Sequence, residues 1–116
     1  MPSLGELERA VMDRLWTARQ DGSGALTARD VQEGLSTSPA TTTVLTVLGR
    51  LERKGLVTRE RDGRAHRYRA VASREDHVAE LMNDALDATP DRGAALARFF
   101  GSIPPDERAR LRDLLG

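Results

Sequence analysis

The chain has 116 residues, of which 39% are hydrophobic and 31% charged, with 18 basic and 18 acidic side chains and no cysteine. This length predicts one compact domain, or one domain with a small appendage. Without cysteine, disulfides, thiolate metal sites and cysteine nucleophiles are excluded. No apolar run approaches the ~20 residues that span a bilayer and no signal peptide opens the chain, so we expect a cytoplasmic protein with no membrane partner.

The charges are unevenly distributed along the chain. From Ala40 to Val71 there are eight basic and three acidic residues, a net charge of +5. From Ser73 to Gly116 there are six basic and nine acidic residues, a net charge of −3. Such a split indicates that the basic half binds phosphate groups and that the acidic half contacts a different partner.

The first third of the chain predicts two helices and a short strand. Residues 4–18 carry apolar side chains at helical spacing, and Asp21 opens a flexible glycine-containing turn. Residues 25–27 predict a very short strand, and Thr27 is a suitable N-cap for a helix over residues 28–35. Pro39 suits the first turn of the next helix, where its missing N–H costs nothing.

That next helix, predicted over residues 40–54 with Gly55 at its C-cap, has two very different sides. At about 100° per residue, one side is apolar and would pack on the scaffold: Val44, Val47, Leu48 and Leu51. The other side is polar and built from small or basic residues: Thr42, Thr43, Thr46, Gly49, Arg50 and Arg53.

Exposed threonines weaken a helix, because the branch at Cβ restricts χ1. A face that accepts this cost is suited to contact with another molecule. Short hydroxyl- and methyl-bearing side chains beside guanidinium groups fit a DNA groove, where they reach phosphates, base edges and thymine methyls. Taken alone, the same face also fits a weakly stable surface helix.

The hydrophobic period then changes from 3.6 to 2, which predicts a β-hairpin over residues 56–71 with its turn at Asp62-Gly63. Five arginines follow its strands and tip: Arg59, Arg61, Arg64, Arg67 and Arg69. A basic hairpin directly after a helix pair is the wing of a winged helix-turn-helix, in which the preceding helix enters the major groove. The helix pair, the threonine face and the basic hairpin together predict a DNA-binding domain over residues 1–72.

Residues 73–116 predict three short amphipathic helices, over 74–88, 94–101 and 105–115, with Ser73 as a plausible N-cap of the first. Three such helices bury little surface by themselves, so they need a partner. The simplest partner is a second copy, giving a two-fold dimer whose reading helices address two half-sites of a palindrome. The predicted dimerisation residues are Val78, Leu81, Met82, Leu86, Leu96, Phe99, Phe100, Leu111, Leu114 and Leu115.

Four stretches of the chain resemble the penicillinase-repressor family of winged-helix regulators (the BlaI/MecI/CopY type). They are the LGELERAVMDRLW segment from Leu4, the TTVLTVLGRLERKGL segment from Thr42, the DGRAHRY segment from Asp62, and the amphipathic tail. The resemblance covers nearly the whole chain. It implies a bacterial homodimeric repressor that sits on operator DNA through the winged domain and dimerises through its C-terminal helices. It also implies that Thr42, Thr43 and Thr46 approach bases or phosphates.

Two regulatory mechanisms of the family can be compared with this sequence. Members controlled by a membrane sensor-protease are cut at an Asn-Phe bond within the dimerisation helices. The resemblance implies Arg98-Phe99 as the corresponding site and a sensor-linked protease as a partner, although arginine replaces asparagine here. Copper-sensing members carry a cysteine pair, which is absent from these 116 residues.

The sequence therefore predicts a mainly α protein with a small β-hairpin that acts as a sequence-specific transcriptional repressor. The predicted DNA-binding residues are Thr42, Thr43, Thr46, Arg50, Arg53, Arg61, Arg64, His66 and Arg67. No phosphate loop, nucleophile elbow or paired-acid motif indicates an enzyme, and no cofactor is predicted.

No carboxylate spacing makes His66 or His77 part of a metal site, and His77 is expected on a helix surface.

The alternative function is a winged-helix module for protein interaction or ligand sensing without operator binding. Strong salt dependence of DNA binding would separate it from a repressor.

Overall fold

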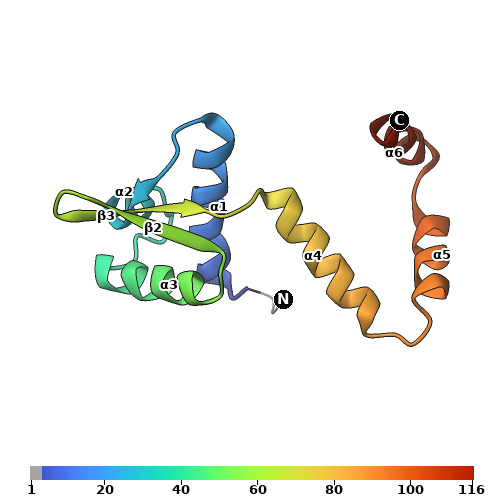
Figure 1. The fold of residues 1–116 in the computed structure, drawn as a ribbon, viewed down its shortest axis with the longest axis horizontal. Coiled ribbons are helices and arrows are strands. Elements are labelled where there is room, and N and C mark those ends of the chain that lie inside the picture. The colour runs from blue at the N-terminus through green and yellow to red at the C-terminus, as the bar shows by residue number, and fades with distance from the viewer. Residues whose placement is uncertain (1–3) are drawn as a thin grey trace. The chain divides into compact units, whose positions relative to one another are not determined.

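The structure is a computed structural model that describes residues 4–116. As predicted, it is mainly α-helical with a small antiparallel sheet (Figure 1). The elements in chain order are α1 (Glu6–Asp21), β1 (Leu26–Thr27), α2 (Ala28–Glu33), α3 (Thr41–Arg53), β2 (Val57–Asp62), β3 (Ala65–Ala70), α4 (Arg74–Asp87), α5 (Arg92–Ser102) and α6 (Pro105–Leu115). The chain divides into two compact units, the first ending at Ala79 and the second running from Glu80 to Gly116.

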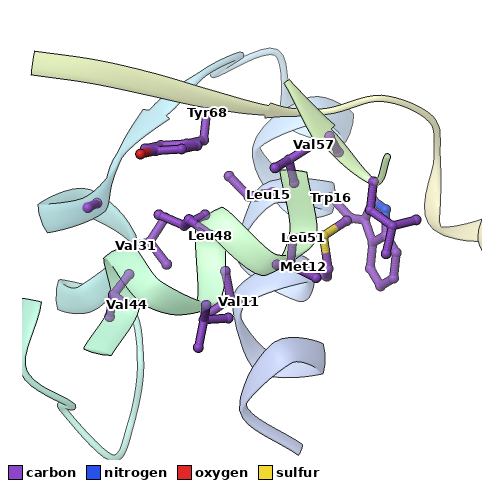
Figure 2. Packing of buried hydrophobic residues seen from close by; sticks show 14 of the residues in the cluster. Val11, Met12, Leu15, Trp16, Val31, Val44, Leu48, Leu51, Val57 and Tyr68 are labelled. Carbon is purple, nitrogen blue, oxygen red and sulfur yellow. The ribbon is translucent and has the colours of Figure 1, made fainter. Parts of the chain in front are cut away.

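The hydrophobic core of the first unit lies between α1, α2, α3 and the sheet (Figure 2). The four apolar residues predicted for the inner side of α3 are all buried in it, with Val44, Leu48 and Leu51 fully inaccessible. The residues that they join are Val11, Met12, Leu15 and Trp16 from α1, Val31 from α2, and Val57 and Tyr68 from the hairpin. One side of α3 is therefore fixed to the scaffold and the other is left outside.

The sheet has the strand order β1-β3-β2, so the hairpin is extended by a third strand that pairs Leu26 with Tyr68. The hairpin closes at Asp62 and Ala65, which places Gly63 and Arg64 in the turn. The prediction of a turn centred on Asp62-Gly63 was therefore wrong by one residue. Gly63 has φ +64° and Arg64 has no positive φ, the pattern of a type II′ turn with glycine first.

The helix boundaries around the threonine helix also differ from the prediction. α3 starts at Thr41 with Ala40 as its N-cap residue, so Pro39 precedes the helix instead of opening it. α2 ends at Glu33, and Leu35 lies beyond it but remains buried. The prediction of Thr27 as the cap of α2 is confirmed, since its side chain accepts the Asp30 N–H while the Asp30 carboxylate accepts the Thr27 N–H.

The first turns of α4 belong to the first unit. Ser73 and Asp76 exchange side-chain-to-backbone hydrogen bonds of 3.1 and 3.3 Å, which confirms Ser73 as the cap. His77 is only 7% exposed, with its ring centroid 5.1 Å from that of Trp16, so the prediction of a surface histidine was wrong. The Arg74 guanidinium lies 5.5 Å from the centroid of the same ring. Sequence periodicity cannot reveal this contact, because it depends on where α4 begins in space.

In the second unit, helices α4 and α5 are joined through Arg92, whose guanidinium donates to Asp87 and Asn83 at 2.6 Å each. Asp91 caps α5 by accepting the Ala94 N–H at 3.0 Å. Ile103 is the one buried hydrophobic side chain among the residues described from Glu80 onward. Much of the apolar surface of this unit is left in solvent.

Candidate nucleic-acid interface

The turn between α2 and α3 is held by one side chain. Gln32 donates from Nε2 to the Pro39 carbonyl at 2.8 Å, and the Thr41 hydroxyl donates to Gln32 Oε1 at 2.6 Å. Ser38, in the same turn, has φ +45°, a left-handed conformation that non-glycine residues rarely adopt. Gln32 therefore fixes the orientation of α3 from its N-terminal end, and no motif in the sequence marked it.

The C-terminal end of α3 is fixed in two ways. Gly55 has φ +80°, its N–H donates to Glu52 O, and the Leu56 N–H donates to Leu51 O, which together form a Schellman motif. The Lys54 ammonium also donates to the Glu8 carboxylate on α1 at 2.8 Å. The hydrogen bond from Lys54, supported by the Gly5 N–H, lowers the pKa of Glu8 below its ordinary value.

The outward side of α3 is the polar surface that the sequence predicted. Thr42, Thr43, Thr46, Arg50 and Arg53 are all exposed. The Thr46 hydroxyl donates to Thr42 O at 3.0 Å, so its hydrogen is used within the helix. Among residues 4–116, neither Arg50 nor Arg53 forms an ion pair with a carboxylate.

The wing presents two chemically different faces, because successive side chains on a strand alternate. Register places Arg61 opposite His66, on the face that carries buried Val57 and Tyr68 farther along. Arg59 on this face pairs at 3.4 Å with Glu52 of α3, so the face lies toward the threonine helix.

On the opposite face, the arginines are neutralised by carboxylates of the hairpin. Arg67 pairs with Asp62 at 2.7 Å, and Arg69 with Glu60 at 3.5 Å. At the tip, Arg64 has no ion pair within the described chain. The structure thus brings Arg61, Arg64 and His66 together at one end of the hairpin and places Arg67 on its other face.

Two kinds of site are not seen in the described part of the chain. Residues 4–116 contain no group of three or more histidine, aspartate or glutamate side chains that could hold a metal ion. None of the helices in this range is long and apolar enough to cross a membrane.

Comparison with known proteins agrees with this geometry. The family model described as the penicillinase repressor matches residues 4–116. The chain belongs to the penicillinase-repressor family. It is 48% identical over 117 residues to the transcriptional regulator BlaI of Mycobacterium tuberculosis, covering 97% of this chain and 82% of that protein. The protein is accordingly a winged-helix transcriptional regulator that binds DNA, and not an enzyme.

Solved structures share the fold at lower sequence identity. A MarR family protein from Bacillus stearothermophilus has a TM-score of 0.50 and 22% identity, over 98% of this chain and 71% of that one. Bordetella bronchiseptica BpsR, whose DNA binding is regulated by 6-hydroxynicotinic acid, has a TM-score of 0.50 and 25% identity, over 97% and 73%. Both likenesses support the winged-helix fold of this penicillinase-repressor family member.

Proposed function

We propose that the protein is a homodimeric repressor that reads a palindromic operator with α3 and contacts the flanking backbone with the wing. The observation that carries this proposal is the outward side of α3. It combines exposed threonines with unpaired Arg50 and Arg53 on a helix whose other side is fully buried. Such a surface reaches both phosphates and base edges in a major groove.

The N-terminal end of α3 supports the same orientation. Ala40 has no side chain that could cap the helix, so the first N–H groups lack a side-chain acceptor. Helix N-termini of this kind bind phosphate, because the N–H groups and the helix dipole both favour an anion. We assign the positioning of α3 to Gln32 and Thr41, and DNA contact to Thr42, Thr43, Thr46, Arg50 and Arg53.

Within the wing, the ion pairs indicate which of the predicted residues are best placed to contact DNA. Arg61, Arg64 and His66 are placed to reach DNA without breaking an ion pair between side chains, although Arg61 Nε donates to Gly63 O at 3.1 Å. Arg67 would first have to leave Asp62. We therefore expect Arg67 to contribute less to phosphate binding than Arg64.

Dimerisation is proposed for the helices after residue 79 together with Val78. Among residues 4–116, six of the eight exposed large hydrophobic residues lie on α4, α5 and α6, namely Val78, Met82, Phe99, Phe100, Leu114 and Leu115. Leu81, Leu86, Leu96 and Leu111 are half-buried and complete the predicted set. A second copy that covers these side chains would remove a large apolar area from water.

The Arg98-Phe99 bond is a proposed proteolytic site in this region, for a sensor-linked protease. It lies within α5, and both residues are exposed. A helical bond must unwind before it enters a protease, so we expect cleavage to require local opening of α5. Incubation with the cognate protease followed by mass spectrometry of the fragments tests this assignment.

The test of operator binding is selection from random duplex DNA followed by affinity measurements over a range of salt concentrations. A repressor that contacts several phosphates loses affinity steeply with salt, with a slope of about −0.9 per phosphate contact. Arg64→Ala should reduce the steepness of that slope by about one, and Arg67→Ala should reduce it by less. A protein that selects no sequence, and binds any duplex weakly, would contradict the proposal and favour a protein-interaction or ligand-sensing module.

A further inference from the structure

One apolar side chain on α3 lies outside its buried stripe. Leu45 is 43% exposed, whereas the other large apolar residues of the helix are at most 4% exposed. It lies one turn after Thr41 and Thr42 and one turn before Gly49, on the side of α3 that is left in solvent. Leu45 belongs neither to the hydrophobic core of the described residues nor to the partly buried side chains packed against that core.

Gly49 provides a second observation at the same place. A glycine inside a helix is destabilising by about 0.5–1 kcal/mol relative to alanine. Helix stability therefore does not explain why glycine occupies this position. A Cβ atom at Gly49 would have one neighbour among the described residues, Arg53 Nη1, at an ordinary contact distance of 3.5 Å. The fold does not need a glycine there, but a molecule that closely approaches α3 beside Leu45 would.

We infer that Leu45 is a specificity-determining residue that contacts the C5-methyl group of a thymine in the operator. This inference rests on the proposed function. Leucine has no donor or acceptor for a phosphate or for the polar base edges. The methyl group that base pairs present in the major groove belongs to thymine, so it is the apolar partner available to an exposed leucine on a reading helix.

The surroundings of Leu45 suit such a contact. The hydrogen of the Thr46 hydroxyl is already donated to Thr42 O, so Thr46 has none left to offer to DNA in this conformation. Gly49 adds no side chain between the helix and the DNA. Leu45, Thr46 and Gly49 together form a small, weakly polar patch between the hydroxyl groups at the start of α3 and the guanidinium groups at its end.

The experiment uses the intact chain and an operator selected from random duplexes. Each thymine is replaced in turn by deoxyuridine, which removes one methyl group, and affinity is measured at a fixed salt concentration. We expect one thymine per half-site to lose about fourfold in affinity on losing its methyl group in the native protein. In Leu45→Ala the same replacement should change affinity by less than twofold, and Leu45→Met should restore the preference.

Val71→Ala is the matched control, because Val71 is an exposed apolar residue at the base of the hairpin, at the end opposite the tip that carries Arg61, Arg64 and His66. It should keep the native response to deoxyuridine. If every replacement has the same effect in Leu45→Ala as in the native protein, the inference is overturned while the proposed function stands. If the protein selects no operator at all, both are overturned.

Discussion

Among single residues, Gly49 lowers the stability of its helix but allows a partner molecule to approach the helix closely. Its replacement by alanine adds one methyl group to an α-helix without a clash, since the nearest described atom outside the local backbone lies at 3.5 Å. Helix propensity alone would favour the alanine. A natural sequence that keeps glycine at such a position is explained by an approaching partner surface.

We therefore predict that Gly49→Ala raises the free energy of unfolding by about 0.5–1 kcal/mol while it weakens operator binding. Chemical denaturation and anisotropy titrations on one preparation measure both quantities. Gly101→Ala in α5, where no described atom outside the local backbone lies within 4 Å of the added Cβ, is the control that should not weaken DNA binding through α3. Unchanged or tighter operator binding by Gly49→Ala would remove the argument for close approach at this position.

At the scale of elements, α3 is held at both ends by polar contacts that were not predicted. The Lys54–Glu8 pair joins the end of α3 to α1, with side chains that are 30% and 14% exposed. Because the folded pKa of Glu8 is lowered, the pair stabilises the fold above the unfolded pKa of a glutamate and loses this contribution as pH falls through the lower, folded pKa.

Lys54→Met should consequently lower the free energy of unfolding by about 1 kcal/mol or less near pH 7, as expected for a partly exposed pair. The difference from the native protein should fade as the pH drops below the ordinary range of glutamate. Glu8→Gln provides the double-mutant cycle, and the two changes should not be additive. A stability difference that is independent of pH would mean that Lys54 acts through packing instead.

The elements themselves were predictable, and the contacts that orient them were not. The change from a 3.6 to a 2.0 period located α3 and the hairpin, and Thr27 and Ser73 located two helix starts. The type II′ turn moved the hairpin tip by one residue because only glycine tolerates its first position. The contacts of Gln32 and of buried His77 depend on how the elements meet in space, which local periodicity does not contain.

The pairing of side chains in the wing was also not predictable from the sequence. Its arginines could be counted from the sequence, but strand register decides which of them remain unpaired. The sequence predicted both Arg64 and Arg67 as DNA contacts. In the structure Arg67 pairs with Asp62, one position diagonal to its register partner Glu60.

The proposed binding to an operator requires two copies of the chain. The exposed apolar side chains of α4 to α6 are concentrated in a part of the chain with one buried hydrophobic residue among those described, Ile103. A helical segment with so little core of its own gains stability from a partner. In the proposed dimer, two reading helices related by a two-fold axis would address two half-sites about one helical turn of DNA, or a multiple of it, apart.

Phe99→Asp should give a monomer in sedimentation velocity experiments and much weaker binding to an operator with two half-sites. Ala94→Asp adds the same charge at an exposed position on the side of α5 opposite Leu96, Phe99 and Phe100, and is the matched control, which should remain a dimer. A Phe99→Asp protein that still sediments as a dimer would place the subunit interface elsewhere.

The substitution Thr43→Glu tests whether the threonine side of α3 lies against DNA. Thr43 is exposed and lies in the first turn of α3, where a carboxylate favours the helix through its dipole, so the variant should fold at least as well as the native protein. Gln20→Glu adds the same charge at the exposed end of α1 as a control. We predict that Thr43→Glu abolishes binding to the selected operator while Gln20→Glu retains it; native affinity in Thr43→Glu would contradict the assignment of α3 as the reading helix.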